Sequence, residues 1–110
     1  MDKDGVGSWE GAILGIDYVA TMCSSLGMNC VANMSLGGPS SSLANQAVAN
    51  AVESGVVMVM ATGNESQDAC LVSPASEPKA LTVGSTDIDD KASQFSNWGS
   101  CVDVYAPGGE

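Results

Sequence analysis

Residues 55–64 read G-V-V-M-V-M-A-T-G-N, and this stretch constrains the fold more than any other part of the sequence. Val56–Ala61 is an unbroken apolar run rich in β-branched residues, which is typical of a strand buried on both faces of a parallel sheet. Gly55 suits the end of a preceding helix. Small and polar residues follow the strand at Thr62, Gly63 and Asn64. Because open α/β sheets place their chemistry at the carboxyl ends of strands, Asn64 is the first candidate functional side chain.

Two interpretations of Asn64 fit the local sequence. Its amide can donate two hydrogen bonds from a rigid strand end to an oxygen that gains negative charge during a reaction. Alternatively, Gly63 and Asn64 form an ordinary turn, since Asn tolerates a left-handed backbone.

Helical periodicity precedes the central strand. One helix is predicted to begin after a Ser8 cap and to fade near residues 23–27, and a second to begin within Ser40–Ser42 and end at Gly55. The predicted apolar positions are Trp9, Ala12, Ile13, Ile16 and Val19 in the first helix, and Leu43, Ala44, Ala47, Val48, Ala51 and Val52 in the second. A short strand over Val31–Ser35 and a breaker loop over Leu36–Pro39 lie between them. Strand, helix, strand is a βαβ unit with parallel strands.

The remaining sequence predicts a polar loop to Glu77, a strand over Ala80–Gly84, an acidic turn and a last strand over Val102–Tyr105. The acidic turn carries Asp87, Asp89 and Asp90 without the glycine and distal Glu of an EF-hand. No linker divides the chain, so the predicted fold class is a single α/β domain with a mostly parallel sheet flanked by helices.

Composition excludes several classes of function. The 110 residues carry 13 acidic side chains against three lysines, a net charge of −10, so we expect no nucleic-acid partner. No run of about 18 apolar residues and no N-terminal signal segment is visible, so we expect no membrane partner. The chain contains no histidine, so a Ser-His-Asp arrangement cannot be completed within it. Its four cysteines lack C-x-x-C spacing, which favours disulfides in an oxidising compartment.

Five short motifs occur in order along the sequence. They are S-L-G-G at 35–38, A-T-G-N at 61–64, S-P-A-S-E-P at 73–78, T-V-G at 82–84 and F-S-N-W-G at 95–99. Together they resemble the subtilisin-like serine proteases (subtilases), and specifically the proteinase K branch, over essentially all 110 residues. The resemblance implies an incomplete form of the three-layer subtilisin-like fold.

The resemblance also implies roles for individual residues in peptide hydrolysis. Asn64 matches the asparagine that supplies the side-chain half of the oxyanion hole in these proteases. Ser35, Leu36 and Gly37 match one wall of the pocket for the side chain before the scissile bond, and Ala61, Thr62 and Gly63 match the opposite wall. Gly5, Val6 and Gly7 resemble the edge strand that pairs with an extended substrate, where glycine leaves the backbone accessible.

A structural calcium ion is a further implication of the resemblance. Pro78 and Ala80 would bind Ca²⁺ through backbone carbonyls and Asp103 through its carboxylate, which are hard oxygen ligands. A solvated or hydrogen-bonded strand residue is the alternative interpretation of Asp103.

One disulfide pairing follows from the same resemblance, and two alternatives stay open for the other cysteines. Cys70 and Cys101 match positions that are bridged in several bacterial relatives. Cys23 pairs with Cys30 across the helix-to-strand connection, or Cys30 pairs with a cysteine outside this stretch.

The catalytic residues of the family have no counterpart in the sequence. The catalytic Asp and the H-G-T-H segment would lie upstream, and the G-T-S-M segment would follow Glu110. We therefore expect residues 1–110 to be the central part of the catalytic domain of a secreted, monomeric endopeptidase that cleaves extended polypeptides, with a preference for apolar or aromatic side chains. The isolated chain is expected to be inactive and to aggregate or remain loosely packed, since the missing parts would leave apolar surface exposed.

Two other interpretations remain at this point. A nucleotide-binding α/β module would cradle phosphate with Leu36–Gly38 and the start of the Ser42 helix, but no Lys or Arg lies near that loop and no G-x-x-x-x-G-K pattern occurs. A pseudoenzyme built on the protease fold is the other.

Overall fold

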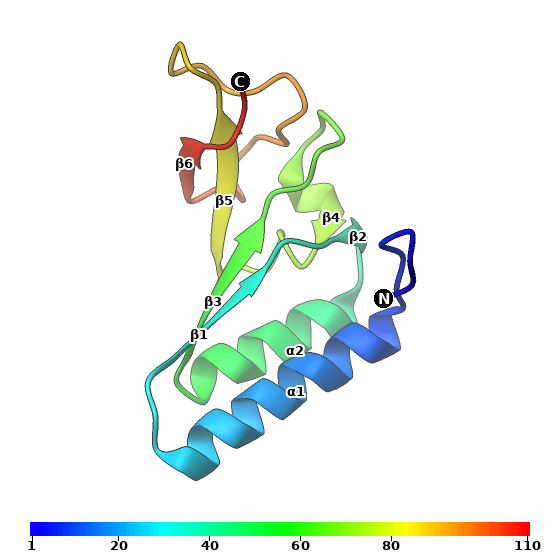
Figure 1. Ribbon diagram of the computed structural model, residues 1–110, viewed down its shortest axis with the longest axis vertical. Helices are drawn as coiled ribbons and strands as arrows, with labels where there is room; N and C mark the ends of the chain where they lie inside the picture. Colours follow the sequence, from blue (N-terminus) through cyan, green and yellow to red (C-terminus); the bar gives the residue numbers. More distant parts are fainter.

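Four parallel strands form the main sheet of the computed structural model, which describes residues 1–110 (Figure 1). In sheet order they are β1 (Cys30–Met34), β3 (Val56–Ala61), β5 (Leu81–Thr86) and β6 (Val104–Pro107). Two short strands, β2 (Gly38–Pro39) and β4 (Val72–Ser73), pair antiparallel in a separate sheet. This architecture confirms the predicted α/β class and the parallel pairing of the strands around the βαβ unit.

Two helices pack side by side against the sheet, as Figure 1 shows: α1 (Trp9–Leu26) and α2 (Ser42–Glu53). Ser8 caps α1 as predicted, because its hydroxyl accepts a hydrogen bond from Gly11 N at 3.1 Å. Ser41 caps α2 in the same way through Ala44 N. The C-cap of α2 is Ser54, so the predicted stop at Gly55 lies one residue too late.

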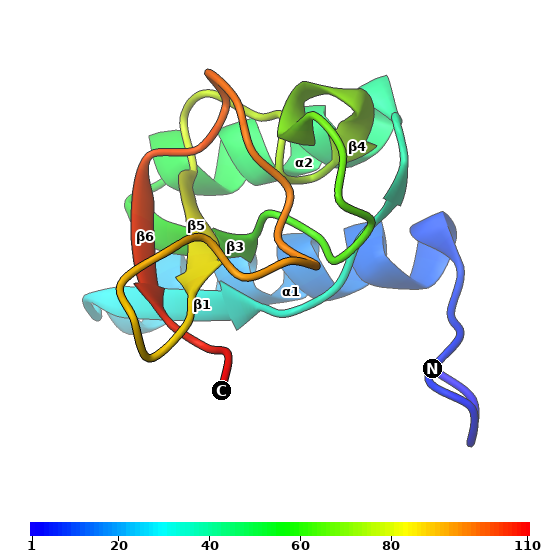
Figure 2. The same ribbon diagram turned by 90° about the horizontal axis from the view of Figure 1, so that it is seen from above.

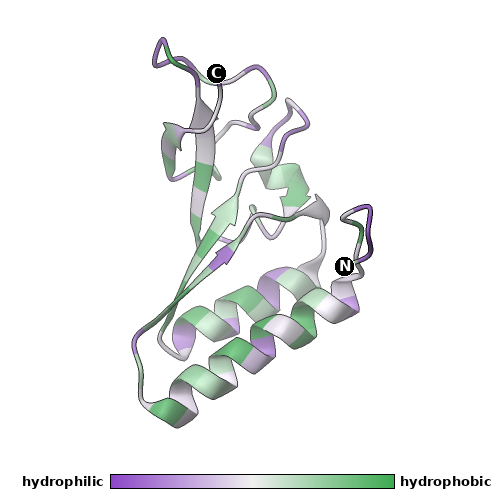
Figure 3. Ribbon diagram, viewed as in Figure 1, coloured by the Kyte–Doolittle hydropathy of each residue, from purple (hydrophilic) through white to green (hydrophobic).

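The core lies between the helices and one face of the sheet. Alternate residues of β3, Val56, Met58 and Met60, are buried against α1 and α2, and the matching positions of β1 are partly buried there. Hydrophobic residues recur along both helices and these strands, with hydrophilic residues between them on the helices and in several loops (Figure 3). Neither helix has the combination of length and apolar character that a membrane crossing requires.

The prediction that β3 is buried on both faces is wrong. Val57 points away from the helices and is 52% exposed, and its neighbour Val31 in β1 is 71% exposed. Both helices cover the same face, so this chain supplies two layers and leaves the opposite face of the sheet accessible. The incomplete character of the predicted fold is visible in that exposed face.

Several smaller predictions also need correction. Leu43 is exposed because it lies roughly a quarter turn around α2 from the centre of the buried face. The predicted breaker loop at 36–39 contains β2, and the predicted polar loop contains β4 and the 3₁₀ helix η1 (Ala69–Leu71). The last two strands begin one and two residues later than predicted, because propensity places strand ends poorly.

Candidate functional site

The register of the central strands brings two predicted pocket walls together. Met34 at the end of β1 pairs with Met60 near the end of β3. Ser35–Gly37 and Ala61–Gly63 therefore leave adjacent strands at the same edge of the sheet. Thr62 is buried and its N–H donates to Val83 O, so Ala61 and Gly63, which are half-buried, are the more accessible members of the second wall.

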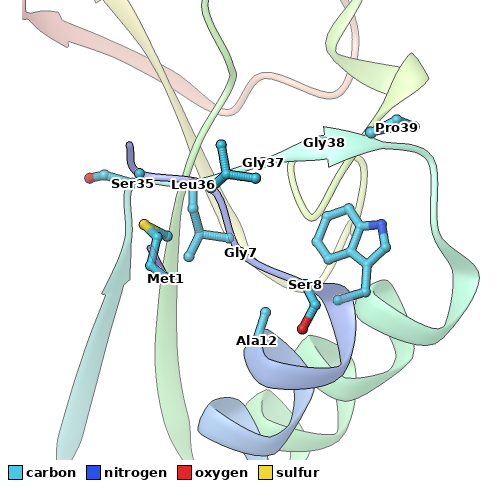
Figure 4. Close-up of a pocket in the computed structure, with 12 residues that line it drawn as sticks. Met1, Gly7, Ser8, Ala12, Ser35, Leu36, Gly37, Gly38 and Pro39 are labelled. Carbon is cyan, nitrogen blue, oxygen red and sulfur yellow. The ribbon is translucent and has the colours of Figure 1, made fainter. Parts of the chain in front are cut away.

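A cavity of about 380 Å³ lies between the N-terminal segment and the residues after β1 (Figure 4). Its lining includes all three predicted residues from each side, Gly5, Val6 and Gly7 with Ser35, Leu36 and Gly37. Met1, Trp9 and Ala12 contribute apolar surface to the same cavity. Residues 61–64 are not part of this lining.

The N-terminal segment is a loop rather than a regular strand. Val6 N donates to the Asp2 carboxylate at 2.9 Å, and Val6 O accepts from Asp2 N at 2.8 Å. Gly7 makes no backbone hydrogen bond within the chain. Of the three residues predicted to pair with substrate, only Gly7 therefore has both backbone polar groups free to pair with another segment.

Asn64 is exposed just beyond the carboxyl end of β3. The preceding Gly63 has φ +99°, in the left-handed region that favours glycine. A Cβ at Gly63 would fall well inside van der Waals distance of the Glu65 carboxylate and of the Asn97 amide nitrogen. The close packing around Gly63 and the exposure of Asn64 mean that a rigid backbone presents an accessible amide.

Asn97 is fully buried, and its side chain forms hydrogen bonds with the backbone on both sides of Asn64. Its Nδ2 donates to Thr62 O at 2.8 Å and to Glu65 Oε2 at 2.7 Å. Its Oδ1 accepts from Glu65 N at 3.1 Å and from Gln67 N at 3.0 Å. Asn97 lies within the F-S-N-W-G motif, but no local pattern indicates its role, because its hydrogen-bond partners lie 30–35 residues away.

Backbone pairing extends this contact beyond Asn97. Trp98 N donates to Gln67 O at 3.0 Å, and Ala69 N donates to Trp98 O at 2.8 Å. A Cys70–Cys101 disulfide then links the two segments covalently. The segment after β3 is thus joined along its length to residues 97–101.

The second disulfide lies at the other end of the molecule. Cys23 in α1 is bonded to Cys30 at the start of β1, which is the intramolecular one of the two alternatives. All four cysteines are paired.

The three residues predicted to bind calcium differ in how exposed they are, and one of them already accepts a hydrogen bond. Asp103 is exposed and its Oδ2 accepts from Thr82 N at 2.7 Å, which uses one of its two carboxylate oxygens. Pro78 is exposed and Ala80 is buried. No three His, Cys, Asp or Glu side chains gather closely enough to hold a metal ion between them.

The loop considered for phosphate binding is already engaged. Gly38 and Pro39 pair with β4. The Ser41 hydroxyl caps α2, and Ser41 N donates to Ser73 Oγ at 2.8 Å. These contacts use the N–H groups of Ser41 and Ala44, two of the backbone donors that a phosphate could bind at the start of α2.

Comparison with known proteins agrees with the motifs. Residues 5–110 match the Subtilase family. The chain is 52% identical to alkaline serine exoprotease A of Vibrio alginolyticus over 110 residues, covering 100% of this chain and 20% of that protein. It is 49% identical to proteinase T of Parengyodontium album, covering 98% of this chain and 38% of that protein.

A solved structure shows the same likeness in three dimensions. The crystal structure of a cold adapted subtilisin-like serine proteinase superimposes with a TM-score of 0.88 at 49% identity, covering 94% of this chain and 37% of that chain. The chain therefore spans between a fifth and two fifths of the length of these relatives. A family match over nearly the whole chain, together with this superposition, shows that the chain belongs to the subtilase family of serine proteases, on its proteinase K-like side.

Proposed function

We propose that this chain supplies the oxyanion-stabilising amide and the substrate-binding walls of a serine endopeptidase. The observation that carries the proposal is the exposed Asn64 amide, which lies at the carboxyl end of β3 on a backbone fixed by buried Asn97. When a peptide carbonyl is attacked, its oxygen becomes negatively charged. An amide that is already aimed at this oxygen stabilises the charge without reorganising.

The cavity beside the N-terminal segment supports an extended polypeptide as the substrate. Gly7 has a free backbone N–H and C=O, which can extend a β-ladder with a peptide. Leu36 and Ala12 give the cavity an apolar lining, which favours apolar or aromatic substrate side chains. The relatives are named as proteases, which favours this interpretation over a nucleotide-binding module.

The nucleophile and the general base would come from outside these residues. The chain has no histidine, so it cannot supply the base that activates a serine in this family. We propose that residues 1–110 form the central part of a monomeric catalytic domain and are inactive alone. Two disulfides in so short a chain support secretion into an oxidising compartment.

A structural Ca²⁺ at Pro78, Ala80 and Asp103 is part of the proposal. The donors are of the type that calcium prefers, and the second oxygen of Asp103 makes no hydrogen bond, but Ca²⁺ takes six to eight ligands, so water would complete the shell. If the site exists, adding Ca²⁺ should raise Tm, and Asp103→Asn should abolish this rise. A rise of the same size in the Asp103→Asn variant would argue against the site.

The central test is a chimera in which this chain replaces the matching segment of the Vibrio alginolyticus exoprotease. Asn64→Ala should lower kcat about 10²–10³-fold with little change in KM, as removal of the oxyanion-hole asparagine does in subtilisin. Asn50→Ala, which removes an exposed amide on α2, is the matched control and should leave both constants unchanged.

The outcomes separate the alternatives. An active chimera whose kcat is unaffected by Asn64→Ala would refute the oxyanion role. A folded chimera without any hydrolytic activity would favour the pseudoenzyme, and saturable nucleotide binding to it would favour the binding module.

A further inference from the structure

We infer that Asn97 is the positioning residue for Asn64, acting through the backbone on both sides of it. The inference rests on the proposed function, because positioning has a catalytic effect only if Asn64 stabilises the oxyanion. Asn97 does not touch the cavity and is fully buried, so its role differs from that of the residues that line the site.

The contacts of Asn97 bracket Asn64 along the chain. Before Asn64, Thr62 O accepts from the Asn97 side chain at 2.8 Å and Gly63 O accepts from Asn97 N at 3.2 Å. After Asn64, Glu65 N and Gln67 N donate to Asn97 Oδ1 at 3.1 and 3.0 Å. The only residue between these anchored groups is Asn64 itself.

The network determines the orientation of the Asn97 amide. Both Nδ2 hydrogens face acceptors, Thr62 O and Glu65 Oε2, and Oδ1 faces two N–H donors. Exchanging the amide oxygen and nitrogen would set donors against donors and acceptors against acceptors. A buried amide with every hydrogen bond made is costly to displace, because any movement leaves buried polar groups without partners.

Such an anchor has a definite catalytic consequence. Asn64 is exposed and lies in no helix or strand. Without the Asn97 side chain, the 62–67 loop keeps the backbone hydrogen bonds from Thr62 N to Val83 O and from Ser66 N to Phe95 O. It loses the side-chain bonds to Thr62 O and from Glu65 N, which lie on either side of Asn64. A displacement of about 1 Å in a catalytic group can cost about 10²-fold in rate.

A double-mutant cycle in the chimera tests this inference. Asn97→Asp keeps the size and the acceptor of the side chain but sets a carboxylate against Thr62 O and the Glu65 carboxylate. We expect kcat to fall by about 10–10²-fold, with KM changed far less. In the Asn64→Ala background, the same substitution should change kcat by less than about 2–3-fold, because the group that it misplaces is already absent.

A second substitution provides a rescue. Glu65→Gln places an amide donor opposite the new carboxylate of the Asn97→Asp chain, and it should recover part of the lost kcat. Glu65→Gln alone is measured as the fourth corner of this cycle, and recovery means that the double variant has a higher kcat than Asn97→Asp.

Asn45→Ala is the matched control for a structural asparagine. Its amide also bridges distant segments, donating to Ser76 Oγ at 2.9 Å, but it lies on α2 and holds the turn after β4. This variant should lower Tm without changing kcat at a temperature where the protein stays folded.

Each outcome decides between the two proposals. Equal fold-changes of kcat in both backgrounds would show that Asn97 is merely structural and would overturn the inference. If Asn64→Ala itself leaves kcat unchanged, the proposed function fails rather than the positioning role. If Asn97→Asp does not fold, Glu65→Ala in the same cycle removes one acceptor of the network and should cost about 2–10-fold in kcat only when Asn64 is present.

Discussion

The loop that follows β3 and the N-terminal segment both supply candidate site residues, but they are held by very different contacts. Residues 62–67 are fixed by a buried side chain with every hydrogen bond made, and a disulfide follows directly after them. Residues 1–7 are exposed throughout and project from the start of α1 (Figure 2). Their hydrogen bonds are those of a turn around Asp2.

The difference fits the two tasks proposed for these regions. Stabilising a transient charge requires a dipole whose orientation is set before the reaction, so rigidity is useful after β3. Pairing with an extended peptide requires free backbone groups that can adjust to the substrate, so an exposed segment is suitable. The contrast is that the fold places buried polar contacts around the residue proposed to stabilise charge and leaves the proposed substrate strand exposed.

The largest predicted effect concerns the covalent end of the rigid region. Replacing Cys70 and Cys101 by Ser should lower the free energy of unfolding by about 3–4 kcal/mol, because the bridge closes a separation of 31 residues. Replacing Cys23 and Cys30, which are 7 residues apart, should cost about 2 kcal/mol. Urea unfolding of the two double-Ser variants of the chimera measures the difference. An equal loss of unfolding free energy in both would show that loop length does not determine how much each disulfide stabilises the protein.

A smaller effect is predicted for the glycine beside Asn64. Gly63→Ala adds a Cβ that meets Glu65 and Asn97, and its φ of +99° disfavours any side chain. Gly55→Ala is the matched control, since its φ is +106° but nothing lies within 4 Å of the added Cβ. Both variants should lose about 1–3 kcal/mol from backbone strain. Only Gly63→Ala should also lower kcat, and equal kcat in both would refute a rigid role for this loop.

This contrast also separates what sequence can predict from what it cannot. The Ser8 cap and the Val56–Ala61 strand were predictable, since caps and apolar runs are local patterns. The motif A-T-G-N indicated Asn64 for the same reason. Asn97 was missed, because a buried amide that serves a loop more than 30 residues away has no periodicity or spacing of its own.

The exposed face of the sheet shows a second limit of the same kind. An apolar run predicts that a strand can be buried on both sides, but not which other segments cover it. Val57 has the composition of a buried residue and is half-exposed because α1 and α2 lie on the opposite face. The short pairing of β2 with β4 escaped prediction too, since Gly38 and Pro39 indicate a breaker on local grounds.

The smallest predicted effect tests the adaptable side of the comparison. Asp2 accepts a hydrogen bond from Val6 N at 2.9 Å, so a substrate that pairs with Val6 must displace this carboxylate. Asp2→Ala frees the Val6 N–H and leaves the backbone bond from position 2 to Val6 O in place. KM for a peptide should therefore fall by about 2–10-fold, which corresponds to the free energy of one net hydrogen bond, while kcat stays constant.

Asp4→Ala makes the same change in charge, but the Asp4 side chain accepts no hydrogen bond, so KM should not change. If both variants bind peptide as the unchanged chimera does, substrate does not pair with Val6, and the N-terminal segment contributes to the site through Gly7 alone.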